Sequence, residues 1–158
     1  MRGKKASKRK IEPDQKFNSI PIAKFINYIM RGGKKSVARS IVYDALEIVS
    51  EKTKQDGLSV FNQAMKNIQP AVEVKGKRIG GANYQVPQVV SGIRKQVLAY
   101  RWLIDAARAR KGKAMSARLA DEVMAAANNE GEAIKKRGNV HKMAESNKAF
   151  AHFGRSGR

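Results

Sequence analysis

The sequence predicts a mainly α-helical fold of about six helices with one protruding β-hairpin and basic, disordered tails. Apolar residues recur at three- and four-residue intervals along most of the chain, which is the period of helices that bury one face. Only residues 72–87 change to strand-like spacing. Because 158 residues is the size of one ordinary domain, we expect a basic extension over residues 1–18, one helical domain over 19–153 and a basic tail over 154–158.

Three helices are expected before the hairpin. Ser19 is a good N-cap for the first, and the Asp56-Gly57 pair is expected to break the second. The expected bounds are Ser19 to Gly32-Gly33, Ser36 to about Thr53, and about Leu58 to Ile68. The side chains expected to face inward are Ile22, Phe25, Ile26 and Ile29, then Val37, Ile41, Ala45 and Ile48 reinforced by Val42 and Val49, then Phe61, Ala64, Met65 and Ile68.

Residues 72–87 are predicted to form two short strands joined at Gly80-Gly81, because both glycines can take the positive φ of a hairpin turn. The sequence leaves the register open. A strict two-residue turn would set Lys77 opposite Tyr84. A three-residue loop with a bulge would instead gather Val72, Val74, Tyr84 and Val86 on one face. The polar surface around the one aromatic is a candidate finger for an RNA groove; its residues are Lys75, Lys77, Arg78, Asn83 and Gln85.

Three more helices are expected after the hairpin. Their bounds are Pro87 to about Arg110, about Met115 to Ala127, and about Glu132 to Phe150. The expected inward residues are Val90, Ile93, Val97, Tyr100 and Ile104, then Met115, Leu119, Val123 and Ala126, then Ile134, Val140, Met143, Ala144 and Phe150. The apolar stripe of the last helix is thin, so we expect this helix to rest on another surface, either RNA or a neighbouring protein.

The charge of the chain indicates an anionic partner. Its 33 Lys and Arg residues outnumber 13 Asp and Glu residues, which gives a formal net charge of +20. The excess lies in three runs, at the N-terminus, over residues 91–118 and over 135–158. One such run is usually a solvated face, but three favour binding to nucleic acid, where phosphate contacts release counterions. Arg94, Arg101 and Arg108 fall seven residues apart, on one helical face.

Several classes of function are excluded or find no support. The absence of Cys rules out a disulfide scaffold and a Cys-based zinc or Fe–S site. No apolar run approaches the roughly 20 residues that span a bilayer, so we expect a soluble, intracellular protein without a membrane partner. His141 and His152 lack the spacing of metal ligands, and Gly33-Lys34 lacks the rest of a phosphate-binding loop. We expect no catalytic residue, no metal, no cofactor and no small-molecule substrate.

Several runs of the chain closely resemble the family of the bacterial seventh protein of the small ribosomal subunit. They appear in the family's order from about Lys10 to Phe153. They include Phe25-Ile26-Asn27, Gly33-Lys34-Lys35-Ser36, Ile41-Val42-Tyr43, residues 70–75 (PAVEVK), residues 80–87 (GGANYQVP), Arg101-Trp102, Lys135-Lys136-Arg137 and residues 141–152 (HKMAESNKAFAH).

This resemblance implies a cytoplasmic protein of the small ribosomal subunit with no enzymatic activity. Such a protein binds small-subunit (16S) rRNA, nucleates assembly of the subunit head and lies near the tRNA exit site, with proteins nine and eleven as neighbours. Its hairpin and last helix would lie near the mRNA and tRNA path, at Lys77, Arg78, Gly80, Gly81, Asn83, Tyr84, His141, Lys142 and Lys148. The side chains expected to bind rRNA are Arg2, Lys4, Lys5, Lys8, Arg9, Lys10, Lys34, Lys35, Lys75, Lys77, Arg78, Arg94, Lys95, Arg101, Arg108, Arg110, Lys111, Lys113, Arg118, Lys135, Lys136 and Arg137.

Two rival functions follow from the composition. Charge and helicity alone would also suit a basic architectural protein that binds duplex DNA. An RNA-modifying enzyme is less favoured, because the sequence offers no cofactor loop and no acid–base cluster.

Overall fold

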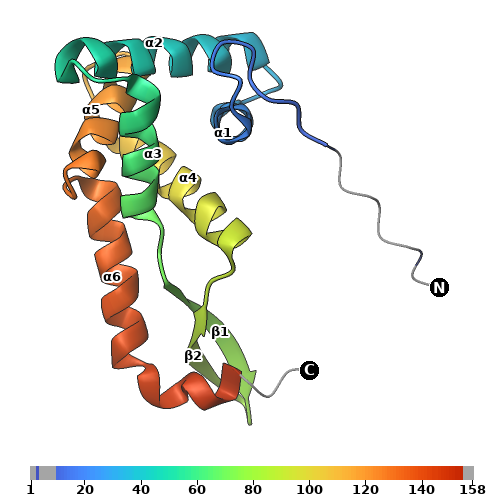
Figure 1. Cartoon of the computed structure of the whole chain (residues 1–158). Coiled ribbons are helices and arrows are strands. Elements are labelled where there is room, and N and C mark those ends of the chain that lie inside the picture. The colour runs from blue at the N-terminus through green and yellow to red at the C-terminus, as the bar shows by residue number, and fades with distance from the viewer. Residues whose placement is uncertain (1–2, 4–9, 155–158) are drawn as a thin grey trace. The chain divides into compact units, whose positions relative to one another are not determined.

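The structure is a computed structural model that describes residue 3 and residues 10–154 (Figure 1). The predicted mainly α-helical fold with one hairpin is confirmed. The chain divides into two compact units, Met1–Ser40 and Ile41–Arg158, and each is described by itself. The domain boundaries expected at residues 18/19 and 153/154 stay predictions.

The first unit contains helix α1, Ile20–Ile29. Ser19 is its N-cap residue, as expected, but the Ser19 hydroxyl makes no capping hydrogen bond. Ile22, Phe25, Ile26 and Ile29 are all buried, which confirms the predicted inward face. The helix stops at Ile29, and the expected glycine pair lies beyond it, where Gly32 and Gly33 take φ values of 56° and 74°. Few other residues adopt these values without strain.

Helix α2, Lys35–Thr53, begins in the first unit and continues into the second. Its buried side chains are Ala38, Val42, Ala45, Leu46 and Val49. The predicted stripe was therefore misplaced: Val37 is 53% exposed and Ile41 and Ile48 are only half-buried. Val42 and Val49, expected only to reinforce the stripe, lie at its centre. Both assignments satisfy helical spacing, so periodicity alone could not separate them.

Helix α3, Gly57–Ile68, starts at the point where the sequence predicted a break. Helix α2 has already ended at Thr53, and Asp56 is the N-cap of α3: its carboxylate accepts a hydrogen bond from the Ser59 backbone N–H at 3.0 Å. A Cβ at Gly57 would lie 2.4 Å from the Leu46 carbonyl oxygen, so a glycine is required for this close approach. The expected inward face of Phe61, Ala64, Met65 and Ile68 is confirmed.

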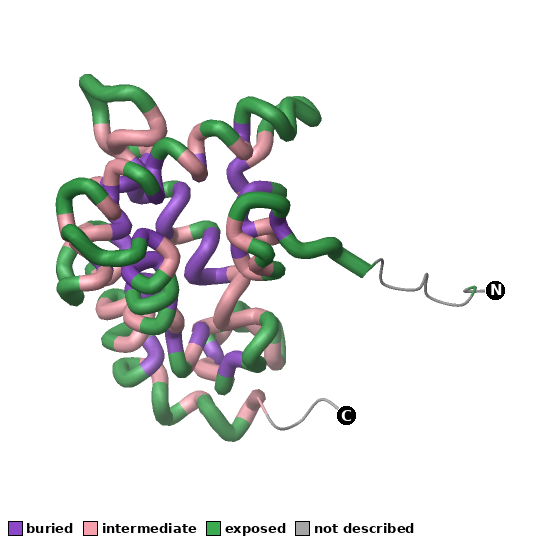
Figure 2. The backbone as a smooth tube through the Cα atoms, turned by 45° about the horizontal axis from the view of Figure 1, so that its top comes forward, coloured by how far each residue is buried: buried purple, intermediate pink, exposed green. Residues whose placement is uncertain are grey.

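The second unit continues with three helices and a short 3-10 helix. These are α4 (Gly92–Ala109), α5 (Met115–Ala127), α6 (Glu132–Ser146) and η1 (Lys148–Gly154). Helix α5 packs on α3 and α4, and α6 contacts α4 and the first strand of the hairpin. Figure 2 shows buried positions recurring along the helices of this core.

Three expectations for these helices are corrected. Met143, expected to face inward on α6, is 46% exposed. Ile93 is 70% exposed at the start of α4, and the buried face of that helix instead includes Leu98, Ala99 and Leu103 alongside Tyr100 and Ile104. The last helix does not run to Phe150. It ends at Ser146, because the backbone turns at Asn147 into η1.

The hairpin consists of β1 (Val72–Ile79) and β2 (Ala82–Val89), paired antiparallel. Lys77 pairs with Tyr84 and Ile79 with Ala82, so the structure adopts the strict two-residue turn. Gly80 and Gly81 both have positive φ, at 57° and 89°. This is the turn whose twist matches that of the flanking strands.

Candidate nucleic-acid interface

The cations predicted to bind RNA divide into two sets once their surroundings are known. Some hold the fold together through contacts with carboxylates or carbonyl oxygens. Others have no ion pair or hydrogen bond within the part of the chain that the structure describes. The five N-terminal candidates Arg2, Lys4, Lys5, Lys8 and Arg9 lie outside the described residues.

Arg110 and Arg118 belong to the first set. Arg110 donates from Nε and from a terminal nitrogen to one oxygen of Glu122, at 2.9 and 2.7 Å. Glu122 is fully buried, and its other oxygen accepts the Ala133 backbone N–H at the start of α6. Arg118 donates to the Arg110 carbonyl oxygen at 2.7 Å, just beyond the end of α4. These two arginines therefore join α4, α5 and α6.

Glu73 on β1 holds two more of the predicted RNA-binding cations. Its carboxylate lies 3.2 Å from both the Lys75 ammonium and Arg94 Nε. Burial alone would raise the pKa of Glu73, but the hydrogen bonds and charges of Lys75 and Arg94 outweigh it and hold this pKa below the ordinary value of 4.5. Arg94 thus ties the start of α4 to the hairpin.

Asp121 on α5 holds a third group. It forms ion pairs with Lys52 at 3.1 Å and Lys113 at 3.0 Å. Burial acts to raise the pKa of Asp121, but the two lysines lower it below 3.8. Lys113 therefore links the loop before α5 to that helix, and is only partly available to RNA.

The remaining internal contacts lie on α6 and the hairpin. Lys135 pairs with Glu132 at 2.7 Å on the surface, where the carboxylate raises the pKa of Lys135. Arg137 donates to the Asn67 carbonyl oxygen near the end of α3. Lys77 donates to the Phe153 carbonyl oxygen at 2.8 Å.

The second set consists of cations without such a contact among the described residues. From the rRNA-binding prediction these are Lys10, Lys34, Lys35, Arg78, Lys95, Arg101, Lys111 and Lys136, and from the tRNA-path prediction Lys142 and Lys148. All are exposed except Lys95, which is half-buried. The three arginines of the predicted α4 stripe are thus unequal: Arg101 is exposed, Arg94 is paired, and Arg108 has a partner within the chain.

The aromatic side chain of the hairpin is not a free stacking platform. The Tyr84 ring packs against Phe150 and Phe153 of η1, with centroids 5.1 and 5.5 Å away. The hairpin residues that remain exposed at the tip are Arg78, Gly80, Gly81, Ala82 and Asn83. The tip, rather than the Tyr84 ring, is therefore the part of the hairpin open to a partner.

His141 also has a structural contact. Its Nε2 atom accepts a hydrogen bond of 3.1 Å from the Ala71 backbone N–H, ahead of β1. This hydrogen bond uses the lone pair of the Nε2 nitrogen. It anchors α6 to the base of the hairpin.

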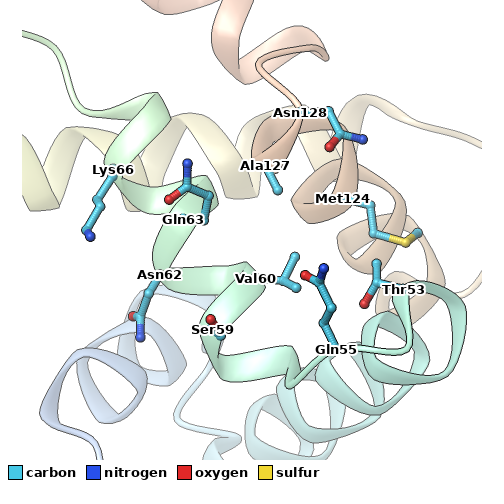
Figure 3. Close-up of a pocket in the computed structure, with 10 residues that line it drawn as sticks. All are labelled: Thr53, Gln55, Ser59, Val60, Asn62, Gln63, Lys66, Met124, Ala127 and Asn128. Carbon is cyan, nitrogen blue, oxygen red and sulfur yellow. The ribbon is translucent and has the colours of Figure 1, made fainter.

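One pocket lies away from the predicted interface. Figure 3 shows it between the end of α2, α3 and α5, with a volume of about 580 Å³. Gln55, Gln63, Asn128 and other small polar side chains line it, and Lys66 is its one cation. None of the predicted site residues lines this pocket.

Sequence reasoning missed Arg39, which lies in a second pocket with the predicted residues Lys10 and Lys35. The signal available was the four-residue spacing of Lys35 and Arg39, which puts both on one face of α2. It was overlooked because the segment around it is nearly neutral. Among the described residues, no group of acidic and histidine side chains could hold a metal ion, and no helix is long and apolar enough to cross a membrane.

Comparison with known proteins gives a consistent answer. Residues 1–148 match the family described as ribosomal protein S7p/S5e. Proteins named small ribosomal subunit protein uS7 are similar along nearly their whole length. The one from Aeromonas hydrophila is 57% identical over 145 residues, which cover 92% of this chain and 93% of the relative. The one from Nitrosomonas europaea is 56% identical over 152 residues, which cover 96% of this chain and 97% of the relative.

A more distant relative extends the match. The small ribosomal subunit protein uS7 of Thermotoga maritima is 52% identical over 153 residues, covering 97% of this chain and 99% of the relative. These findings confirm the resemblance drawn from the sequence runs and the expectation of a non-enzymatic protein. The chain therefore belongs to the S7p/S5e family of ribosomal proteins.

Proposed function

We propose that this chain is a structural component of the small ribosomal subunit that binds the subunit's rRNA directly and nucleates assembly of its head. The coarser part follows from family membership: the chain is a ribosomal protein that acts in translation, and its site of action is a cytoplasmic particle. The finer part rests on the cations described above.

The observation that carries the proposal is the set of cations, all exposed except the half-buried Lys95, whose side chains have no partner inside the described chain. Arg78, Lys95, Arg101, Lys111 and Lys136 all belong to the second unit. A protein gains nothing in folding stability from unpaired charges, which repel one another. Phosphate contacts would neutralise them and position the protein on folded RNA by backbone and shape.

The hairpin tip and the end of the chain are assigned to the mRNA and tRNA path near the exit site. The tip offers Arg78 and Asn83 beside two glycines whose lack of side chains permits close approach of a nucleic-acid backbone. Lys142 and Lys148 add exposed charge along α6 and η1. Ribosomal proteins nine and eleven are the proposed neighbours.

Sedimentation tests where the protein acts. A tagged copy expressed in bacterial cells should sediment with the small subunit in a sucrose gradient and remain there at moderate salt. A tagged copy that stays at the top of the gradient would contradict the proposal.

A binding comparison separates this function from the architectural DNA-binding rival. The purified chain should bind transcribed small-subunit head RNA in preference to duplex DNA of equal length, measured in the same buffer. Equal affinity for the two would favour the rival, because charge alone does not distinguish folded RNA from a duplex.

A further inference from the structure

The first unit contains a pocket with three walls. Residues 10–15 form one wall, Ala23, Ile26 and Asn27 of α1 form the second, and Lys35 and Arg39 in the first turns of α2 form the third. The pocket volume is about 470 Å³, within the roughly 300–1,000 Å³ typical of sites for small ligands. All three walls lie within the first unit (Figure 1, blue segments).

The three walls arise from local structure. The spacing of Ala23, Ile26 and Asn27 puts them on one face of α1, and Lys35 and Arg39 share a face of α2. The extended segment is held by its own turn: the buried Asp14 carboxylate accepts the backbone N–H groups of Lys16 and Phe17, at 3.1 and 3.3 Å. The pocket is therefore built from positioned elements.

The chemistry of the lining is mixed. Lys10, Lys35 and Arg39 supply positive charge, whereas Glu12 supplies an exposed carboxylate and Asn27 an exposed amide. The side chains of Glu12, Asn27, Lys10 and Lys35 make no hydrogen bond or ion pair to other described residues. The pocket can thus bind a phosphate and, beside it, both donors and acceptors of a polar group.

Arg39 has hydrogen-bonding capacity left over. One terminal nitrogen donates to the Gln15 side-chain oxygen at 3.1 Å, which fixes the guanidinium against the extended segment. Its Nε atom is buried without a hydrogen-bond partner. A guanidinium held in this way keeps its second terminal nitrogen for a phosphate oxygen, a group that arginine binds well.

We propose that this pocket binds one unpaired nucleotide of the small-subunit rRNA, with its phosphate at Lys35 and Arg39 and its base edge at Asn27 and Glu12. The inference rests on the proposed rRNA-binding function and adds a base-reading site to it. A pocket that bound only a phosphate group would need only the cations. An amide and a carboxylate beside those cations match the donors and acceptors on the edge of a base, and sequence-specific readers of RNA bind such unpaired bases.

Nucleotide titration tests the ligand class directly. The full chain is titrated at physiological salt with each of the four nucleoside 5′-monophosphates, and with ribose 5-phosphate as the probe that lacks a base. At least one nucleotide should produce saturable NMR shifts of the Asn27 side-chain amide and of Arg39, and ribose 5-phosphate should leave the Asn27 amide unmoved. Equal shifts from ribose 5-phosphate, or no saturable shift from any nucleotide, would overturn the proposal.

Chemical probing of bound RNA tests the site in its proposed context. Asn27→Ala removes an exposed amide and should leave the fold intact, and Asn62→Ala, an exposed amide on α3, is the matched control. We expect Asn27→Ala to weaken binding to transcribed small-subunit RNA roughly tenfold, as for loss of one base-edge contact, and to uncover one short unpaired stretch to chemical modification. Asn62→Ala should match the wild type.

The outcomes separate the two proposals. If the wild-type chain fails to bind the RNA, the proposed function fails. If the wild type binds and Asn27→Ala leaves both affinity and modification pattern unchanged, only the nucleotide pocket is refuted.

Discussion

Glu122 shows how one carboxylate can join three helices. It lies on α5, is fully buried, receives Arg110 from just beyond α4 and caps the start of α6 through the Ala133 N–H. A buried carboxylate needs such partners, because desolvation otherwise outweighs its contribution. Arg110, expected from sequence to bind RNA, stabilises the fold through this contact.

Replacing Glu122 should therefore destabilise the protein. Glu122→Gln keeps the side-chain shape and the acceptor for Ala133 but leaves Arg110 without its counter-charge, at an expected cost of about 1–3 kcal/mol in the free energy of unfolding. Urea denaturation measures this cost. Glu132→Gln, which breaks only the exposed pair with Lys135, should change the free energy of unfolding much less, because exposed ion pairs contribute little to stability. Equal effects of the two variants would show that the buried contact is unimportant.

Arg101 and Arg94 should behave differently although they share a helix face. Arg101→Gln should weaken RNA binding and leave the melting temperature nearly unchanged, since exposed substitutions seldom change stability by more than about 0.5 kcal/mol. Arg94→Gln should also lower the melting temperature, because it removes a partner of Glu73. Melting curves and RNA titrations of the two variants and the wild type check both predictions. A large loss of stability in Arg101→Gln would mean that the whole stripe is structural.

Glu73 and Asp121 predict how stability depends on pH. Both pKa values are lower in the folded chain than their ordinary values of 4.5 and 3.8. A carboxyl group whose pKa is lower in the folded chain than in the unfolded chain stabilises the fold. This stabilisation is fully present at pH values above the ordinary pKa, and it is lost as the pH falls through the pKa of the folded chain. The free energy of unfolding should thus decrease below about pH 4.5. Denaturation measured at a series of pH values above and below this point checks the prediction. A Glu73→Gln/Asp121→Asn variant should lose less stability on acidification than the wild type.

At the scale of elements, the hairpin and the C-terminal segment act as one unit. Tyr84 packs on Phe150 and Phe153, and Lys77 donates to the Phe153 carbonyl oxygen. Of the hairpin residues 77–83, Lys77 takes part directly in this contact with η1.

A single substitution tests this coupling. Tyr84→Ala should leave the helical core folded but free η1, so that hydrogen exchange increases at residues 148–154 and in β2 while α3 and α5 stay protected. Arg78→Gln at the exposed tip is the control, and should leave exchange in η1 unchanged. Unchanged protection of η1 in Tyr84→Ala would contradict the coupling.

The elements themselves were largely predictable. Six helices and the hairpin follow from apolar spacing and from glycine and proline positions, because those features act locally. The buried face of α2 and the exposure of Ile93 were not predictable. Neighbouring apolar positions fit the same helical period, and only tertiary packing selects among them. The end of α6 at Ser146 was missed for a similar reason: Phe150 satisfies helical spacing yet packs on Tyr84.

The candidate site was predictable in composition and not in detail. Counting charges predicts a candidate RNA-binding surface, but Arg110 and Arg101 look alike in sequence. Only the fold brings Glu122 to the first and leaves the second exposed. Arg39 was missed because its pocket depends on residues 10–15 lying against α1, which no local pattern encodes.

At the scale of the whole molecule, a net charge of +20 is separated into cations that stabilise the fold and cations that remain available to a partner. The second set is expected to account for RNA affinity. If about 6 to 10 phosphates are neutralised, affinity should fall roughly 10³- to 10⁵-fold between about 50 and 200 mM salt.

The most direct test compares this salt dependence in the wild type and in an Arg78→Gln/Lys95→Gln/Arg101→Gln variant on the same small-subunit head RNA. Each lost phosphate contact should reduce the slope of log affinity against log salt concentration by roughly 0.7 to 0.9, so the variant's slope should be shallower by about two to three. Its melting temperature should match the wild type. An unchanged slope in a folded variant would show that these cations do not contact RNA, and would contradict the division of charges on which this account rests.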